Sequence, residues 1–150
     1  MITLKPITPF NYKQVTLLRA SPTQSAFTPS ATEILARAYA WRDMYSRALA
    51  ICYNDGIVGV LLLSDGMNGY ELKHLLIDVK HQRKGYGKKT VKHLLSRLRR
   101  EKRSDSISVS VSRSNEAAMG LFKALGFREP GYGDPFKPEA CVLVYTFPAG

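Results

Sequence analysis

Apolar and polar residues change their spacing several times along the chain, and each change predicts a different element. Near the N-terminus, residues 3–8 can form an edge strand, and Thr8-Pro9 is typical of a helix start. A second helix has two competing start signals, Thr28-Pro29 and Ser30-x-x-Glu33, followed by apolar residues at helical spacing. The first forty residues therefore predict a strand and two helices.

Three apolar runs follow, at residues 47–53, 57–63 and 70–79. Asn54-Asp55-Gly56 separates the first two and is a strong hairpin turn, and residues 64–69 form a second turn. We therefore expect a three-stranded antiparallel meander.

The spacing then becomes helical over residues 87–100, where apolar residues recur at i, i+3, i+4 and i+7 and Lys and Arg fill the other face. Residues 106–112 alternate Ser with Ile and Val, which indicates a half-buried strand. The run 70–79, this helix and this strand form a βαβ unit, so the two strands should be parallel.

Ser114 or Asn115 can cap a further helix that ends at Gly126, and residues 141–147 form the last strand. The order predicts one domain over residues 1–150. We expect an α/β fold with a mixed, mostly antiparallel sheet, a central parallel βαβ unit and flanking helices.

The composition is that of an ordinary globular protein, with 45% hydrophobic and 23% charged residues. No apolar run is long enough to span a bilayer, and the N-terminus lacks the apolar core of a signal peptide, so we expect a cytoplasmic protein. Cys52 and Cys141 lie in strand-like runs and are expected to be buried thiols rather than a disulfide. Two cysteines and three scattered histidines give no metal-ligand spacing, so no metal site is predicted.

The net charge is +10, and much of it lies between Lys80 and Arg103. Within that stretch, residues 82–88 join a strand end to a helix start. Gly85 and Gly87 permit close approach of a ligand, and the free N–H groups of a helix start favour an anion. The loop is therefore a candidate phosphate site, the alternative being a basic turn into a solvated helix.

Two other phosphate loops are excluded by single positions. A dinucleotide fingerprint needs glycine where this chain has Thr90, and a Walker loop needs glycine where it has Gln82.

The chain resembles the GNAT superfamily of N-acetyltransferases. Gln82-Arg83-Lys84-Gly85-Tyr86-Gly87 is similar to the family's [Gln/Arg]-x-x-Gly-x-[Gly/Ala] loop, and residues 115–127 are similar to its Asn-x-x-Ala…Leu-Tyr-x-x-x-Gly-Phe segment. The element order also fits, so the resemblance covers nearly the whole chain. It implies a GNAT-like acyl-CoA N-acyltransferase fold and acetyl-CoA as the acetyl donor.

The resemblance also implies roles for particular residues. Backbone N–H groups of the loop would bind the pyrophosphate, and strand residues would pair with the pantetheine arm and hold the thioester oxygen. Asn115 would contact the same arm, or act only as a helix cap. The predicted cofactor-binding residues are Leu75, Ile77, Gln82, Arg83, Lys84, Gly85, Tyr86, Gly87, Lys88, Asn115 and Phe122.

The acetyl group would pass directly to a neutral amine, which requires a base. Glu71 is the candidate, eleven residues before Gln82, where some family members carry a catalytic glutamate. Regular alternation places it on the same face as Leu75 and Ile77 and opposite His74, unless a bulge intervenes; a plain surface carboxylate is the alternative. Phe122 stands where many members have the tyrosine that protonates the thiolate, and Tyr86, Tyr132 and Tyr145 are open substitutes.

The expected function is acetyl transfer from acetyl-CoA to a primary amine of a small molecule. The segment from Gln24 to Tyr39 resembles the bacterial spermine/spermidine acetyltransferase-like branch, so a polyamine is the first candidate; members of that branch often carry a carboxylate where this chain has Lys73. The alternatives are a protein N-terminus or lysine as acceptor, or a CoA-binding domain without catalysis. A nucleic-acid partner is disfavoured because no aromatics interleave the basic helix. No membrane partner is expected, and the sequence is compatible with a homodimer.

Overall fold

A computed structural model describes residues 1–66, 69–131 and 139–149. In this part of the chain, six strands form one sheet in the order β1-β2-β3-β4-β5-β6. All neighbouring strands are antiparallel except β4 and β5, which are parallel. The predicted mixed sheet with a central parallel βαβ unit is therefore confirmed. The strands are β1 (Ile2–Pro6), β2 (Ser46–Tyr53), β3 (Gly56–Gly66), β4 (Gly69–Ile77), β5 (Ser106–Ser112) and β6 (Ala140–Thr146).

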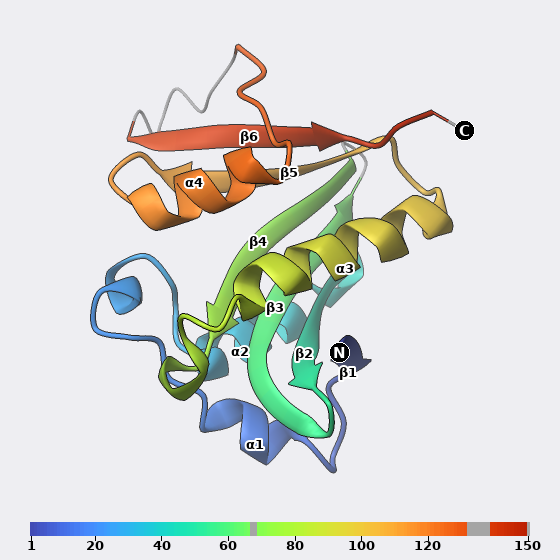
Figure 1. Cartoon of the computed structure of the whole chain (residues 1–150). Helices are drawn as coiled ribbons and strands as arrows, with labels where there is room; N and C mark the ends of the chain where they lie inside the picture. The colour runs from blue at the N-terminus through green and yellow to red at the C-terminus, as the bar shows by residue number, and fades with distance from the viewer. Residues whose placement is uncertain (67–68, 132–138, 150) are drawn as a thin grey trace.

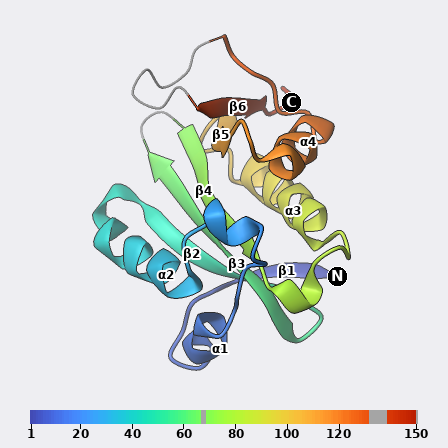
Figure 2. The same cartoon turned by 90° about the vertical axis from the view of Figure 1, so that its left-hand side faces the viewer.

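Helices cover both faces of the sheet, as Figures 1 and 2 show. Helices α1 (Tyr12–Thr16) and α2 (Ala31–Ala40) lie on one face, and α3 (Tyr86–Glu101) and α4 (Glu116–Ala124) lie on the other. The short 3₁₀ turns η1 (Gln24–Ala26), η2 (Arg42–Met44) and η3 (Val79–His81) lie in the connections.

Two helix starts resolve the ambiguities of the sequence. Ser30 caps α2, because its Oγ accepts a hydrogen bond from the Glu33 N–H at 3.1 Å. The first helix begins at Tyr12, later than Thr8-Pro9 predicts. The Thr8 carbonyl accepts from both Asn11 and Tyr12, and the Asn11 side chain accepts from the Thr8 N–H at 2.8 Å, so residues 8–11 form a turn instead.

The core has one apolar layer on each face of the sheet. Leu61 and Leu63 of β3 pack with the buried face of α3, whereas Val60 and Leu62 pack beneath α1 and α2. This alternation is the period of two expected of a strand buried on both faces.

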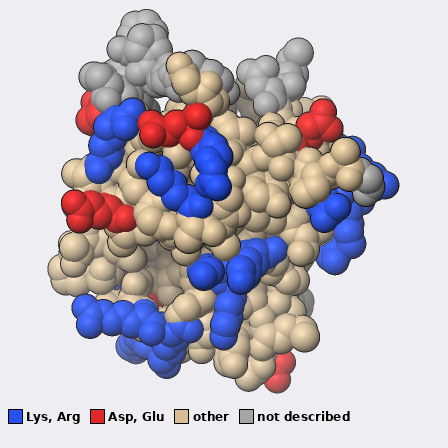
Figure 3. Space-filling model, turned by 45° about the horizontal axis from the view of Figure 1, so that its top comes forward, with Lys and Arg blue, Asp and Glu red and all other residues tan. Residues whose placement is uncertain are grey.

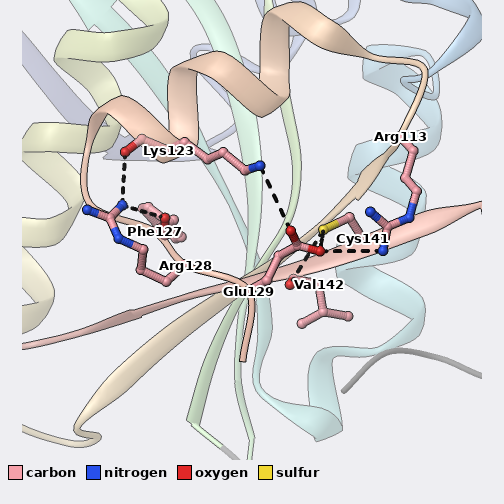
Figure 4. A network of polar contacts seen from close by, with 7 residues as sticks. All are labelled: Arg113, Lys123, Phe127, Arg128, Glu129, Cys141 and Val142. Carbon is pink, nitrogen blue, oxygen red and sulfur yellow. Dashed lines mark hydrogen bonds and ion pairs between the residues drawn. The ribbon is translucent and has the colours of Figure 1, made fainter. Parts of the chain in front are cut away.

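A polar network ties α4 to the C-terminal strand (Figure 4). Glu129 lies between Arg113 and Lys123, with N–O distances of 3.4 and 3.9 Å, and accepts a hydrogen bond from the Cys141 thiol at 3.1 Å. Cys52 and Cys141 are both free and buried, as predicted. The network joins the segment after β5, helix α4 and β6, and so holds α4 against the C-terminal strand.

Candidate active site

Strands β4 and β5 pair over only three residues and then separate. The parallel ladder joins Tyr70 to Ile107, Glu71 to Ser108 and Leu72 to Val109, and the strands diverge beyond it (Figure 1). A cavity of about 660 Å³ lies along this split, lined by residues 72–75 of β4 and 109–112 of β5. The edge of β4 that faces the cavity therefore offers backbone N–H and C=O groups that no ladder partner uses in the described chain.

A bulge in β4 changes which side chains share a face. Leu62 of β3 pairs with His74, but Leu63 pairs with Leu72, so Lys73 is an extra residue. The bulge reverses the expected alternation: Glu71 lies on the same face as His74 and opposite Leu75. The expectation that Glu71 shares a face with Leu75 and Ile77 is therefore wrong.

The phosphate loop has the backbone that its glycines allow. Gly85 is the N-cap of α3 with φ of 77°, and Arg83 also has a positive φ, 62°. No side chain caps this helix start. The first N–H groups of α3 therefore lie open at the cavity, whose wall includes Gly85, Tyr86, Gly87 and Lys88.

Gly87 is a helical residue for which the protein provides no packing reason. A Cβ built there would have the Leu121 Cδ2 as its nearest neighbour, at 3.9 Å, which is ordinary contact. Glycine in a helix interior costs about 1 kcal/mol relative to alanine, and the cost at Gly87 is expected to be smaller because it is the second residue of α3. The space that this Cβ would fill belongs to the cavity, so the glycine leaves room for a ligand against the helix start.

Most of the residues predicted to bind the cofactor line this one cavity. The two predicted site residues that do not line it are Lys84, which is exposed, and Glu71, which is half-buried. The lining includes Leu75, Ile77, Gln82, Arg83, Gly85, Tyr86, Gly87, Lys88, Asn115 and Phe122.

The Gln82 side chain is already fully engaged. Its amide exchanges two hydrogen bonds with the Gln24 amide, at 3.1 and 2.9 Å, and its Nε2 donates to the Ile77 carbonyl at 2.6 Å. The residue thus ties the phosphate loop to β4 and to η1, instead of extending a free amide toward a ligand.

Other side chains near the loop differ in what they face. The Tyr86 ring lies 4.8 Å from that of Tyr53, and the Lys89 Nζ lies 5.8 Å from the Tyr53 centroid and 5.9 Å from the Tyr86 centroid. Lys89 therefore faces this aromatic pair, whereas Lys88 faces the cavity. His81 also lines the cavity, and its Nδ1 is buried without a hydrogen-bond partner in the described chain.

Helix α4 contributes a cap and an aromatic ring. The Asn115 Oδ1 accepts from the Ala118 N–H at 3.2 Å, so Asn115 is both an N-cap and part of the cavity wall. Phe122 is buried against Phe127, with ring centroids 5.1 Å apart. The Tyr145 ring packs on the other side of this cluster, with its centroid 5.6 Å from that of Phe127, and it does not line the cavity. Tyr132 lies outside the described residues.

Several lining residues are not among those that the sequence predicts for the site. Gln24, Phe27 and Thr28 belong to the segment between α1 and α2, and Glu139 directly precedes β6. Ser110 lines the cavity from β5, and the Ser/Val alternation of that strand is the signal that could have indicated a polar face. The other residues approach the cavity only through the tertiary fold, so no local pattern identifies them.

His74 lines the cavity as a neutral side chain. Its Nε2 lies 3.1 Å from the Arg37 Nη1, and Arg37 lies 2.6 Å from Glu33. Burial, then the positive charges of Arg37 and Lys73, lower the pKa of His74 to about 4 against an opposing effect of Glu33. Because a guanidinium can only donate, the Nε2 lone pair is occupied and His74 cannot serve as a base through it.

On the face that Figure 3 shows, Lys and Arg form several patches between uncharged residues, and Asp and Glu cover less of it. The charged side chains lining the cavity from the described residues are the cations Lys73, Arg83 and Lys88 and the carboxylate Glu139. Within the same residues, no group of His, Cys, Asp and Glu could hold a metal ion. None of the described helices has the length and apolar character needed to cross a membrane.

Solved structures with the same fold are numerous. An acetyltransferase from Thermus thermophilus is 23% identical, with a TM-score of 0.74 and coverage of 98% of this chain and 97% of that one. A spermidine N-acetyltransferase from Vibrio cholerae, crystallised with CoA and spermine, is 15% identical, with a TM-score of 0.73 and coverage of 97% and 95%. The ribosomal-protein-S18-alanine N-acetyltransferase from Escherichia coli is 19% identical, with a TM-score of 0.72 and coverage of 100% and 96%. At these identities the likeness establishes the fold.

A sequence comparison with curated proteins gives no significant match. The model of the acetyltransferase (GNAT) family matches residues 13–127, which is most of the chain. Together with the fold and the glycine loop at the split sheet, this match establishes that the chain belongs to the GNAT acetyltransferase family.

Proposed function

We propose that this protein transfers an acetyl group from acetyl-CoA to a primary amine of a small molecule. The observation that carries the proposal is the open start of α3, with Gly85 and Gly87, at one end of a cavity that continues between β4 and β5. A diphosphate fits the helix start, and an extended amide-containing chain fits the unpaired edge of β4.

The residues present fit acetyl-CoA in three respects. Gly87 leaves its Cβ position open, His81 offers a buried nitrogen without a partner in the described chain, and Arg83 and Lys88 place positive charge beside the helix start. The thioester supplies an activated acyl group, and a backbone N–H of β4 near Leu75 would stabilise the charge that develops on its oxygen.

The acceptor amine must be neutral when it attacks. Glu71 is the proposed base; because it lies beside the cavity wall and not in it, we infer that a water molecule carries the proton to it. Among the described residues, Glu139 is the carboxylate that lines the cavity directly, and it is the alternative base. Phe122 cannot donate a proton, so the thiolate would leave unprotonated or take its proton from solvent.

The test is release of CoA from acetyl-CoA in the presence of a panel of primary amines, including polyamines, with peptides bearing a free N-terminus or lysine. We expect turnover with at least one small amine, a large loss of kcat in Glu71→Gln, and a small effect of Glu139→Gln. The reverse order of the two variants would assign the base to Glu139. Tight binding of CoA without release on any amine would refute transfer and favour a CoA-binding domain, the reading that Phe122 motivates.

A further inference from the structure

Positive charge lies at two separate ends of the cavity. Arg83 and Lys88 flank the phosphate loop, whereas Lys73 lies where β4 leaves β5. Residues 73 to 77 of β4 run between these two ends of the cavity. At the rise of an extended strand, the two ends are therefore roughly 13 Å apart. Lys73 is thus too distant to serve the helix start, and its charge belongs to the part of the cavity where the acceptor would lie.

The bulge gives Lys73 its position. As the extra residue of β4, it has no partner across the ladder to β3, and its side chain is exposed while it lines the cavity. Its Nζ lies 6.0 Å from the centroid of the Trp41 ring, a loose cation–π contact. None of the ion pairs formed by the described residues includes Lys73. The ammonium is therefore available to a ligand.

His74 adds a neutral donor next to Lys73. Because Arg37 donates to Nε2, the proton of the neutral ring resides on Nδ1. The ion pair of Arg37 with Glu33 holds the guanidinium in place and offsets its charge. Arg37 is accordingly a positioning residue that fixes the tautomer of His74, and the ring can offer an N–H to the cavity that it lines.

We propose that the acceptor is an amine that carries a carboxylate a few bonds away, bound by the Lys73 ammonium and the His74 Nδ1–H. This inference rests on the proposed function and narrows its substrate class. A cation beside a neutral donor suits an anionic group. A second ammonium on the acceptor, as in a polyamine, would meet the like charge of Lys73 instead.

The experiment separates binding from turnover. Propylamine, 3-aminopropanoate and 1,3-diaminopropane share a three-carbon chain and differ in the charge at one end, as do their homologues with up to six carbons. Each is titrated calorimetrically into the protein saturated with CoA, so that no reaction occurs. We expect the aminoalkanoates to bind at least tenfold more tightly than the diamines, with the alkylamines between them.

Variants at the two binding residues test the assignment. Lys73→Met should remove most of the preference for aminoalkanoates over diamines, and Lys73→Glu should reverse that preference. His74→Gln should weaken the binding of the aminoalkanoates alone, by several-fold. Lys92→Glu on the solvent face of α3 makes the same charge change outside the cavity and should leave the order unchanged. Arg37→Met should weaken the aminoalkanoates and shift the ring ¹⁵N signals of neutral His74 away from those of the Nδ1-protonated tautomer, a change that loss of the Arg37 charge alone would not produce.

Some results would overturn the inference. These are diamines that bind as tightly as aminoalkanoates, a Lys73→Glu variant that keeps the original order, or no binding of any aminoalkanoate at millimolar concentration. Turnover of the same amines with acetyl-CoA is measured separately. Tight aminoalkanoate binding without acetylation would refute the proposed function and leave the assignment of the anion site intact.

Discussion

The side-chain amides of Gln24 and Gln82 bind each other in both directions, at 3.1 and 2.9 Å. They join the segment between α1 and α2 to the phosphate loop, across 58 residues of sequence. Helix η1, which carries Gln24, has no buried residue of its own. The amide pair therefore attaches η1 to the phosphate loop, in addition to the hydrogen bonds that join Arg19 of the same segment to Asp78 and Val79.

Removal of the pair should cost stability in a coupled way. Each bond contributes about 0.5–1.5 kcal/mol net, so a double-mutant cycle of Gln24→Ala and Gln82→Ala should give a coupling of about 1–2 kcal/mol in urea unfolding. Gln82→Ala should be the more damaging single change, because it also removes the bond to the Ile77 carbonyl. The exposed Gln14→Ala in α1 is the control and should be near neutral. Additive single effects would show that the amide pair contributes no coupling.

Gly87→Ala should stabilise the protein and weaken its binding of CoA. The new methyl group meets nothing closer than Leu121 Cδ2 at 3.9 Å, and the helix gains about 0.5–1 kcal/mol from the better propensity of alanine. The same methyl group occupies cavity space at the helix start, and a loss of affinity of about tenfold corresponds to 1.4 kcal/mol. Thermal unfolding and calorimetric CoA titration measure the two effects.

Gly120→Ala is the matched control for that change. Gly120 is also a helical glycine, is exposed on α4, and has no atom within 4 Å of the built Cβ. It does not line the cavity. A similar gain in stability is expected with unchanged CoA affinity. Equal CoA binding by both alanine variants would contradict the placement of a ligand against Gly87.

Local signals account for what the sequence predicted correctly. The apolar spacing of α3 depends on residues within a few positions of one another. The same holds for the Ser30 cap of α2 and the Asn115 cap of α4, each of which is one of two starts that the sequence offers. The meander and the parallel pair of the βαβ unit are predicted because a hairpin turn and a crossover helix leave few alternative pairings. Most of the predicted cofactor residues line one cavity because they belong to a single loop and the strand before it.

Tertiary pairing decides what the sequence could not predict. The bulge at Lys73 depends on how β4 aligns with β3, and one extra residue moves Glu71 to the opposite face. The Arg37–His74 contact joins residues 37 positions apart, and the Gln24–Gln82 pair joins residues 58 apart. The residues at these positions follow no periodic pattern, so the sequence around one residue does not identify the residue that it contacts.

His74 should titrate far below an ordinary histidine, with a pKa of about 4 in the folded protein. Since the unfolded pKa is near 6.5, the unfolded chain binds more protons between these values, and stability should fall as pH decreases from about 6.5 to about 4. Histidine NMR signals followed with pH measure the pKa directly. Arg37→Leu should raise it by removing a nearby positive charge. A pKa of 6 or higher for His74 in the unmodified protein would contradict the contact between the Arg37 guanidinium and the His74 ring.

Both cysteines should resist thiol reagents in the folded protein. Burial raises the pKa of the Cys52 thiol, and burial followed by the hydrogen bond to the Glu129 carboxylate raises that of Cys141. The thiolate is the reactive form, so both accessibility and ionisation oppose reaction at pH 8. We expect no labelling by 5,5′-dithiobis(2-nitrobenzoate) over an hour in buffer and rapid labelling of both thiols in guanidinium chloride. The substitution Glu129→Gln should raise the labelling rate of Cys141 more than that of Cys52, because only the Cys141 thiol donates to the Glu129 carboxylate (Figure 4). Fast reaction of the native protein at either thiol would show that its strand opens on that timescale.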